Sequence, residues 1–208
     1  MQPQIPLTRD LLLIGGGHTH ALLLRRWGMA PLPGVRLTLV NPGPTAPYSG
    51  MLPGHVAGHY TRQELDIDLV RLARFAGARL VLAHATGIDT LARRVTTDTG
   101  REIDYDIASI DVGITAQMPN LPGFAEHAIP AKPLDSYAQA WRDFLARLDA
   151  GKATPDVAVI GAGVAGVELS MAMAHAMRAR GTDPRVTLVE RGPGLTGLPS
   201  GTVGRGVV

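Results

Sequence analysis

One stretch late in the chain constrains the fold more than any other: an apolar run that leads directly into a glycine turn and a helix start. Val157 to Ile160 are apolar and mostly β-branched, which is typical of a strand covered on both faces in a parallel sheet. Three glycines follow this run, namely Gly161, Gly163 and Gly166. In a βαβ unit such glycines allow a tight turn, a close approach of pyrophosphate to the backbone, and close packing of the helix on the strand. The stretch therefore predicts a dinucleotide-binding unit.

The segments after this turn fit the same unit. A helix expected over residues 164–180 points its free amides and its positive dipole end at the phosphates. Residues 185–190 predict the second strand, and Glu190 at its end is placed to accept ribose hydroxyls. Glu190 favours NAD because a carboxylate repels a 2′-phosphate, whereas Arg191 beside it could accept that phosphate and leaves NADP open. The alternative is a glycine-rich turn in an α/β protein that binds no nucleotide.

The same order of strand, glycine turn, helix and strand occurs near the start of the chain. Residues 10–14 predict a buried strand, and residues 21–27 predict a helix. Residues 35–40 predict the next strand, which ends at Asn41. The turn between the first strand and the helix consists of Gly15, Gly16, Gly17, His18, Thr19 and His20. We therefore expect an α/β fold with two Rossmann-like dinucleotide-binding domains and two bound nucleotides.

The first copy departs from the fingerprint at two positions. His20 stands where the third glycine belongs, and a side chain there is expected to push helix and strand apart. Asn41 stands where the ribose acid belongs, and it is a neutral acceptor and donor. Phosphate binding depends on Gly15, Gly17 and the helix amides, so the prediction of a nucleotide site stands.

The remaining segments predict the domain layout. Residues 41–54 are expected to form an irregular loop, either a rigid surface loop or one beside a ligand. Helices are expected over residues 62–76 and 134–148, strands over 79–83 and 107–111, and a hairpin over 93–105. We predict a first nucleotide-binding domain over residues 1–118, a crossover over 119–154, and the beginning of a second nucleotide-binding domain over 155–208.

Composition excludes several function classes. The formal net charge is +2 without a run of Lys or Arg, so we expect no nucleic-acid partner. The chain has no cysteine, which excludes disulfides, thiolate metal sites and a redox cysteine pair within it. No apolar run approaches the roughly 20 residues of a membrane span, and the start lacks the pattern of a signal peptide. A cytoplasmic location is the expectation, and peripheral membrane association stays open.

Four histidines support a rival hypothesis of a metal site. His55 and His59 are four residues apart and could share a helix face, with His18 and His20 as further ligands. Against this, a helix containing Pro53 would only just have begun at His55, and no glutamate lies between the pair as a hydrolytic base. Histidines that line or cap a nucleotide site are the favoured interpretation, and we expect no metal.

These motifs together resemble the flavoproteins with two dinucleotide-binding domains, which include disulfide reductases, type II NADH dehydrogenases and sulfide:quinone reductases. Residues 11–17 resemble the turn that binds the FAD pyrophosphate, and residues 110–113 resemble the segment beside FAD. Residues 47–54 and Lys132-Pro133 resemble the NADH dehydrogenase-like flavoproteins often joined to selenide, water dikinase. The resemblance implies FAD at the first turn and NAD at the second. It places at the flavin the turn residues 15–20, Asn41, Tyr48, Ser49, Gly50, Met51, Asp111 and Gly113.

The resemblance also implies the reaction. Without a cysteine pair, a hydride passes directly from NAD(P)H to FAD, and electrons pass on to an acceptor that the sequence does not identify. Glu168 is implied beside the meeting point of nicotinamide and flavin, and a helix-start acid is the alternative. Lys132 could stabilise a reduced, anionic flavin, or it is an ordinary surface cation.

The resemblance stops at Val208, well before the members of the family end. The second domain is therefore expected to be incomplete, with an exposed sheet edge and exposed apolar helix faces. The alternative function is a catalytically incomplete nucleotide-binding fragment. A homodimer is compatible with the sequence.

Overall fold

The computed structural model describes residues 6–113 and 122–190. The chain forms two compact units, Met1–Tyr48 with Asp66–Ile114 and Ser49–Leu65 with Thr115–Val208. The expected mixed α/β class is confirmed. Residues 49–65 belong to the second unit, although the predicted first domain ran through residue 118 without a break. The predicted domain boundaries stay predictions.

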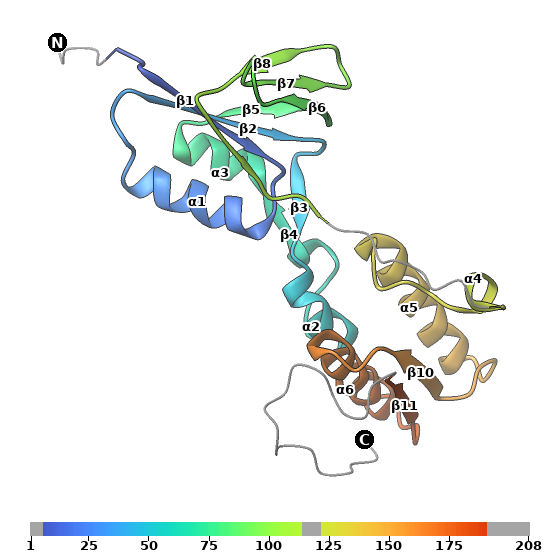
Figure 1. Ribbon diagram of the computed structural model, residues 1–208. Coiled ribbons are helices and arrows are strands. Elements are labelled where there is room, and N and C mark those ends of the chain that lie inside the picture. Colours follow the sequence, from blue (N-terminus) through green and yellow to red (C-terminus); the bar gives the residue numbers. More distant parts are fainter. Residues whose placement is uncertain (1–5, 114–121, 191–208) are drawn as a thin grey trace, which may run out of the picture. The chain divides into compact units, whose positions relative to one another are not determined.

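The first unit is built on a parallel sheet with the order β5-β2-β1-β9. The strands are β1 (Arg9–Ile14), β2 (Val35–Asn41), β5 (Arg79–Leu82) and β9 (Ile107–Ile110). Helices α1 (His18–Met29) and α3 (Leu69–Ala76) pack side by side on one face. The other face carries a three-stranded antiparallel sheet, β6 (Ala85–Asp89), β7 (Arg94–Thr97) and β8 (Glu102–Asp104) (Figure 1). This is the expected Rossmann-like arrangement.

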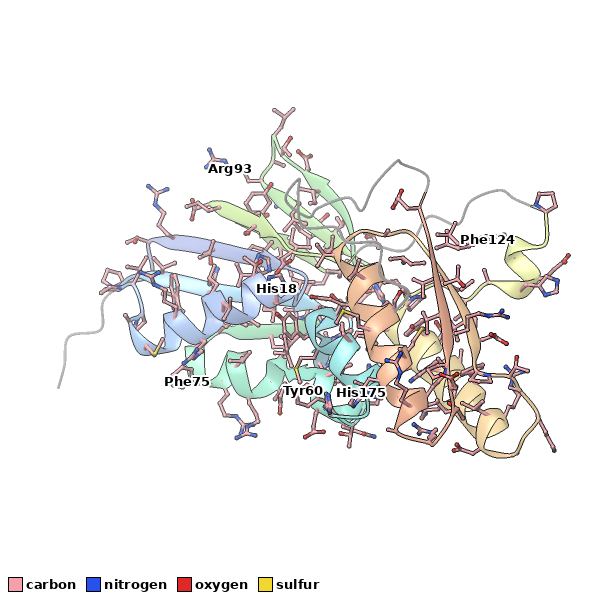
Figure 2. All side chains as sticks on the ribbon, turned by 90° about the horizontal axis from the view of Figure 1, so that it is seen from below. His18, Tyr60, Phe75, Arg93, Phe124 and His175 are labelled. Atoms are coloured by element: carbon pink, nitrogen blue, oxygen red, sulfur yellow. The ribbon has the colours of Figure 1, made fainter. Side chains whose placement is uncertain are left out.

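Strand β1 is covered on both faces. Leu13 packs in the apolar cluster under α1 and α3, whereas Leu12 and Ile14 pack in the cluster under β7 and β8. Close packing of the two helices depends on Gly28 of α1, because a Cβ there would overlap the ring of Phe75 on α3 (Figure 2). The apolar run before the first glycine turn is therefore the centre of this unit.

The helix predicted over residues 62–76 is wrong in its first half. Helix α3 begins after Asp68, whose Oδ1 accepts a hydrogen bond from the Arg71 amide, and ends at Gly77 with φ of 64°. The preceding residues form a 3-10 turn, η2 (Gln63–Leu65), and strand β4 (Asp66–Asp68). Strand β4 pairs antiparallel with β3 (Thr45–Pro47). An aspartate with a favourable N-cap geometry competes with helix continuation, and here the cap determines the start.

The second unit is mainly helical. It contains α4 (Phe124–His127), α5 (Leu134–Asp149) and α6 (Val164–Arg178), with the parallel strands β10 (Asp156–Ile160) and β11 (Arg185–Val189). The expected irregular loop over 41–54 is wrong as well, because it contains β3, a 3-10 turn η1 (Ser49–Met51) and the start of helix α2 (Leu52–Val56). Trp141 of α5 donates its indole N–H to the Val56 carbonyl (3.0 Å), which ties α2 to the core.

Strand β10 differs from the strand that the sequence predicts. Val157 and Val159 pack against the apolar core of the second unit, but Ile160 is 61% exposed and Val189 of β11 is 47% exposed. The prediction of cover on both faces is wrong for this strand, since only one of its faces meets the core in the described part of the unit. Across residues 6–113 and 122–190, no helix is both long and apolar enough to cross a membrane.

The core of the second unit contains a hydroxyl without a partner, which leads to a stability prediction. Tyr137 is 6% exposed and, within the described residues, its hydroxyl forms no hydrogen bond. Burial raises the pKa of Tyr137 to about 12. We expect Tyr137→Phe to stabilise the protein by about 1 kcal/mol at neutral pH, because it removes a buried unsatisfied polar group. Denaturant unfolding of the two proteins measures the difference.

The expected effect of Tyr137→Phe depends on pH, because the Tyr137 hydroxyl can ionise. The pKa of Tyr137 in the folded protein lies above the ordinary value of 10. The folded state therefore keeps its full free energy of unfolding below pH 10 and loses part of it as the pH rises toward 12. The advantage of Tyr137→Phe should therefore grow by about 1.4 kcal/mol between pH 8 and pH 11. An advantage that is constant over this range would contradict the assignment.

Candidate nucleotide-binding site

A groove of about 400 Å³ lies in the first unit at the carboxyl ends of the parallel strands. This edge is where open α/β sheets bind ligands, because the glycine turns and the helix N-termini meet there. Its lining includes the first glycine turn, the residues that follow β2, and the end of β9: Gly15, Gly16, Gly17, Asn41, Pro47, Asp111 and Gly113. The groove therefore brings together predicted site residues from three separate parts of the chain.

Hydrogen bonds to strand β2 fix the first glycine turn. Gly15 adopts φ of 88°, a left-handed conformation that favours glycine, and its amide donates to the Val40 carbonyl (2.8 Å). The Gly16 amide donates to Oδ1 of Asn41 (2.9 Å), and Nδ2 of Asn41 donates to the Gly43 carbonyl (2.7 Å). Asn41 is buried, so its side chain holds the turn in addition to any role toward a ribose.

The second glycine turn repeats this construction in the second unit. Gly161 has φ of 102°, and its amide donates to the Val189 carbonyl (2.8 Å). The Ala162 amide donates to Oε2 of Glu190 (2.8 Å), as Gly16 does to Asn41. The two turns share one backbone geometry but differ by one negative charge at the end of the second strand.

A repeated ion pair at the start of each strand pair was missed by the sequence analysis. Arg36 pairs with Asp10 across β2 and β1, and Arg185 pairs with Asp156 across β11 and β10. The sequence contains a signal for it, because each aspartate stands five residues before the first glycine of its turn. Likewise, each arginine stands five residues before Asn41 or Glu190.

His20 is accommodated without separating the helix from the strand, so the expected displacement is wrong. The imidazole is 1% exposed, and its Nδ1 lies 2.7 Å from the Gly15 carbonyl, which can only accept a hydrogen bond. Its Nε2 lies 2.9 Å from Oγ of Ser109 on β9. The polar ring thus links turn, helix and neighbouring strand. At the equivalent place in the second turn, a Cβ on Gly166 would overlap the Gly161 carbonyl oxygen.

Asp111, the residue that follows strand β9, caps helix α1. The helix has no side-chain cap of its own at Gly17, and Oδ2 of Asp111 accepts the His20 amide (2.9 Å). The Asp111 carbonyl accepts the Gly17 amide (3.2 Å). The family resemblance places Asp111 at the flavin, but no local spacing in the sequence connects residues 20 and 111, so the sequence does not predict this cap.

The two turns leave different sets of amides for an anion. In the described residues, the amides of His18 and Thr19 have no acceptor at the start of α1. Within the same described residues, four amides at the start of α6 have no acceptor, those of Gly163, Val164, Ala165 and Gly166. Backbone amides at a helix N-terminus bind phosphate through hydrogen bonds and the helix dipole. Both turns are therefore suited to a pyrophosphate, and the second offers more donors.

Other predicted site residues lie around these turns. The rings of His18, labelled in Figure 2, and Tyr48 lie 5.7 Å apart in a tilted arrangement. Ser49, Gly50 and Met51 form η1 of the second unit. Glu168 is exposed on α6, and Lys132 is half-buried just before α5. Their predicted approach to a flavin involves residues of both units and stays a prediction.

The histidines do not form the arrangement required by the metal hypothesis. Helix α2 ends at Val56, so His55 and His59 do not share a helix face, although the helix does include Pro53. Nδ1 of His55 lies 2.8 Å from the Tyr60 carbonyl, and His59 packs against His175 of α6. Within the described part of the chain, no three His, Asp or Glu side chains are grouped so that they could hold a metal ion.

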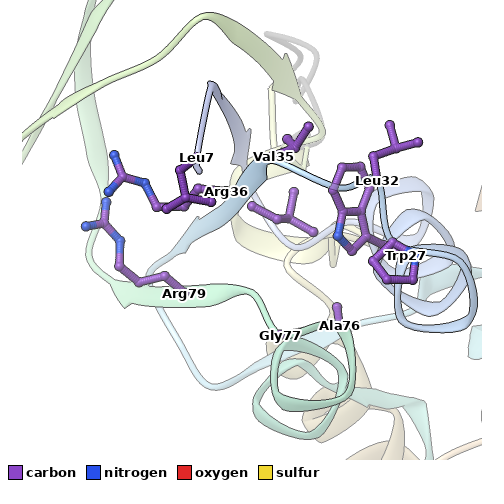
Figure 3. A pocket seen from close by; sticks show the side chains of 10 residues that line it. Leu7, Trp27, Leu32, Val35, Arg36, Ala76, Gly77 and Arg79 are labelled. Atoms are coloured by element: carbon purple, nitrogen blue, oxygen red, sulfur yellow. The ribbon is translucent and has the colours of Figure 1, made fainter. Parts of the chain in front are cut away.

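A second groove of about 400 Å³ lies in the first unit and contains none of the predicted site residues. Leu7, Trp27 and Leu32 contribute its apolar walls, and Arg36 and Arg79 line it with their side chains extended alongside each other (Figure 3). It lies at Val35, the first residue of β2, whereas the glycine turns lie at the carboxyl ends of the strands. This groove is therefore separate from the candidate nucleotide site.

Comparison with known proteins agrees with this geometry. The chain is 27% identical over 189 residues to the NADH dehydrogenase-like protein YutJ of Bacillus subtilis, covering 88% of this chain and 49% of that protein. The chain thus spans about half the length of this curated relative. Among solved structures, it is similar to the sulfide:quinone oxidoreductase of Aquifex aeolicus, with a TM-score of 0.70, 20% identity, and coverage of 88% of this chain and 43% of that one.

The structure of NDH2 from Plasmodium falciparum in complex with NADH is also similar, with a TM-score of 0.69 and 17% identity, covering 90% of this chain and 42% of that one. At these identities, the two solved structures establish the fold. The family model described as pyridine nucleotide-disulphide oxidoreductase matches residues 9–201, which is nearly the whole chain. The chain therefore belongs to the pyridine nucleotide-disulphide oxidoreductase family.

Proposed function

We propose that this chain carries the nucleotide-binding turns of a flavoprotein that passes a hydride from NAD(P)H to FAD, and electrons on to an unidentified acceptor. The observation that supports it best is the pair of glycine turns of one construction, each beside a helix with unengaged amides. Membership of a family named for pyridine nucleotides, and similarity to an NADH dehydrogenase-like protein, support the same reaction class.

In this proposal the first turn binds FAD. The amides of His18 and Thr19 donate to the pyrophosphate, and Asn41 keeps the turn in place through Gly16. Tyr48 and His18 present aromatic rings beside the turn. When bound, the flavin supplies the redox chemistry, while the protein binds and orients it.

The second turn binds the nicotinamide dinucleotide in this proposal. The four amides at the start of α6 are the donors for its pyrophosphate, and Glu190 brings a negative charge to the adenosine ribose. Glu168, exposed on α6, is proposed to hold the nicotinamide carboxamide, and Lys132 to favour the reduced flavin. Neither residue forms an ion pair with any described part of the chain, so each charge is available to a ligand.

The chain lacks the redox chemistry after which the family is named. It contains no cysteine, so no dithiol within it can relay electrons from a flavin. In this proposal, electrons leave the flavin for the acceptor without passing through a dithiol of this chain.

An anaerobic titration tests the proposed function. We expect the purified protein with FAD to show the visible absorption of bound flavin, and NADH to bleach it. A protein that binds neither FAD nor NADH would contradict the proposal. A protein that binds both without bleaching would instead favour the second candidate function, a nucleotide-binding piece without turnover.

Glu190→Gln should weaken the preference for NADH over NADPH. Glutamine retains an oxygen that can accept the Ala162 amide, so the turn is kept while the negative charge is lost. We expect the ratio of the NADPH to the NADH dissociation constant to fall by about tenfold, equivalent to about 1.4 kcal/mol. Fluorescence titration with both nucleotides measures this ratio.

The matched control is Asp183→Asn, which removes an exposed acid of the same unit outside the turn. It should leave the ratio unchanged. An equal shift in both variants would mean that overall charge, rather than the position of Glu190, sets the preference.

A further inference from the structure

The carboxylate of Asp111 lies directly against the first glycine turn. A Cβ placed on Gly17 would overlap its carboxylate atoms, whereas a Cβ on Gly163, the equivalent position of the second turn, would meet no atom of residues 6–113 or 122–190 within 4 Å. Gly17 therefore makes room for a side chain of the protein itself. In the second turn the corresponding space is open.

The Asp111 carboxylate occupies part of the anion-binding site at the N-terminus of helix α1. Its Oδ2 accepts the His20 amide, and a negative charge at a helix N-terminus is stabilised by the helix dipole. Among the described residues, His18 and Thr19 then keep amides without an acceptor at this helix start, compared with four residues at the start of α6. An internal anion thus sits where an external phosphate would be attracted.

No Lys or Arg side chain in the described lining of the groove offsets this charge. The lining contains Asp111 and the imidazole of His84, but no Lys or Arg. A pyrophosphate at the His18 and Thr19 amides would bring a further negative charge close to the carboxylate, and like charges at such separations repel. Salt screens this repulsion where the site is open to solvent.

We propose that Asp111 is a positioning residue that caps α1 and at the same time weakens the hold of the first turn on a dinucleotide pyrophosphate, so that FAD binds there less tightly than the turn would otherwise allow. The inference rests on the proposed function of the first turn. It predicts that the flavin is exchangeable, and that the affinity is limited by one identified charge.

The test compares FAD binding by the wild-type chain, Asp111→Asn and Asp111→Ala. Asparagine keeps the size and an oxygen that can accept the His20 amide, so it removes the charge alone, whereas alanine also removes the cap. Flavin fluorescence titration at low salt should show Asp111→Asn binding FAD about fivefold more tightly than wild type. The difference should shrink at about 0.5 M salt, because screening removes a repulsion but not a structural effect.

Two controls separate charge from folding. Glu102→Gln removes an exposed acid of the same unit on β8 and should leave FAD affinity unchanged. Thermal unfolding should show wild-type stability for Asp111→Asn and a lower melting temperature for Asp111→Ala. Unchanged or weaker FAD binding by a folded Asp111→Asn would overturn the inference while leaving the proposed function intact. Absence of FAD binding in every variant, including wild type, would reject both.

Discussion

Replacing Gly166 with alanine should destabilise the protein by about 3 kcal/mol or more, because the added methyl group would overlap atoms of the turn. A Cβ at this position would overlap the backbone carbonyl oxygen of Gly161, which is fixed in the β10–α6 turn. Helix α6 would have to move away from the turn. Denaturant unfolding followed by circular dichroism measures the loss.

Gly163→Ala is the matched comparison for this prediction. Gly163 has φ of −69°, which any residue adopts, and a Cβ there would meet no heavy atom of the described part of the chain within 4 Å. We expect stability within about 0.5 kcal/mol of wild type, together with weaker NADH binding, since the methyl group lies where a pyrophosphate approaches. Equal stability losses in the two variants would show that the third glycine has no special packing role.

His20→Ala should produce the largest loss in the first unit, about 3 kcal/mol. The substitution leaves a cavity and removes the partners of the buried Gly15 carbonyl and of the half-buried Ser109 hydroxyl. Thermal and denaturant unfolding measure the effect. His18→Ala is the control, because His18 is exposed two residues earlier on the same helix and its loss should cost less than about 0.5 kcal/mol.

A second variant shows whether the imidazole is needed or merely tolerated. His20→Gly restores the glycine fingerprint found at Gly166. We nevertheless expect it to be at least as unstable as His20→Ala, because glycine also weakens the helix. Wild-type stability of His20→Gly would contradict the view that the ring has replaced the close helix–strand contact of the second turn.

Local sequence patterns predicted the structural features that depend on interactions between residues close together in the chain. The strand, turn, helix and strand order of both copies was confirmed, because apolar runs and glycines act over a few residues. The predictions failed where a longer-range or competing interaction decided. Asp68 capped a helix later than its apolar periodicity suggested, and α2 formed within a segment rich in proline and glycine.

The sequence by itself determined that the chain builds two glycine turns between parallel strands, and that no cysteine takes part in its chemistry. Only the tertiary structure decided how the two turns differ. Pairing of β1 with β9 brings Ser109 and Asp111 to His20, across about 90 residues of chain, and gives the first turn an internal cap and an internal charge. No local spacing records such a contact, because it depends on strand order in the sheet. Each turn is held by the side chain that follows its second strand, Asn41 or Glu190, but only the first turn has the further side-chain contacts of His20 and Asp111.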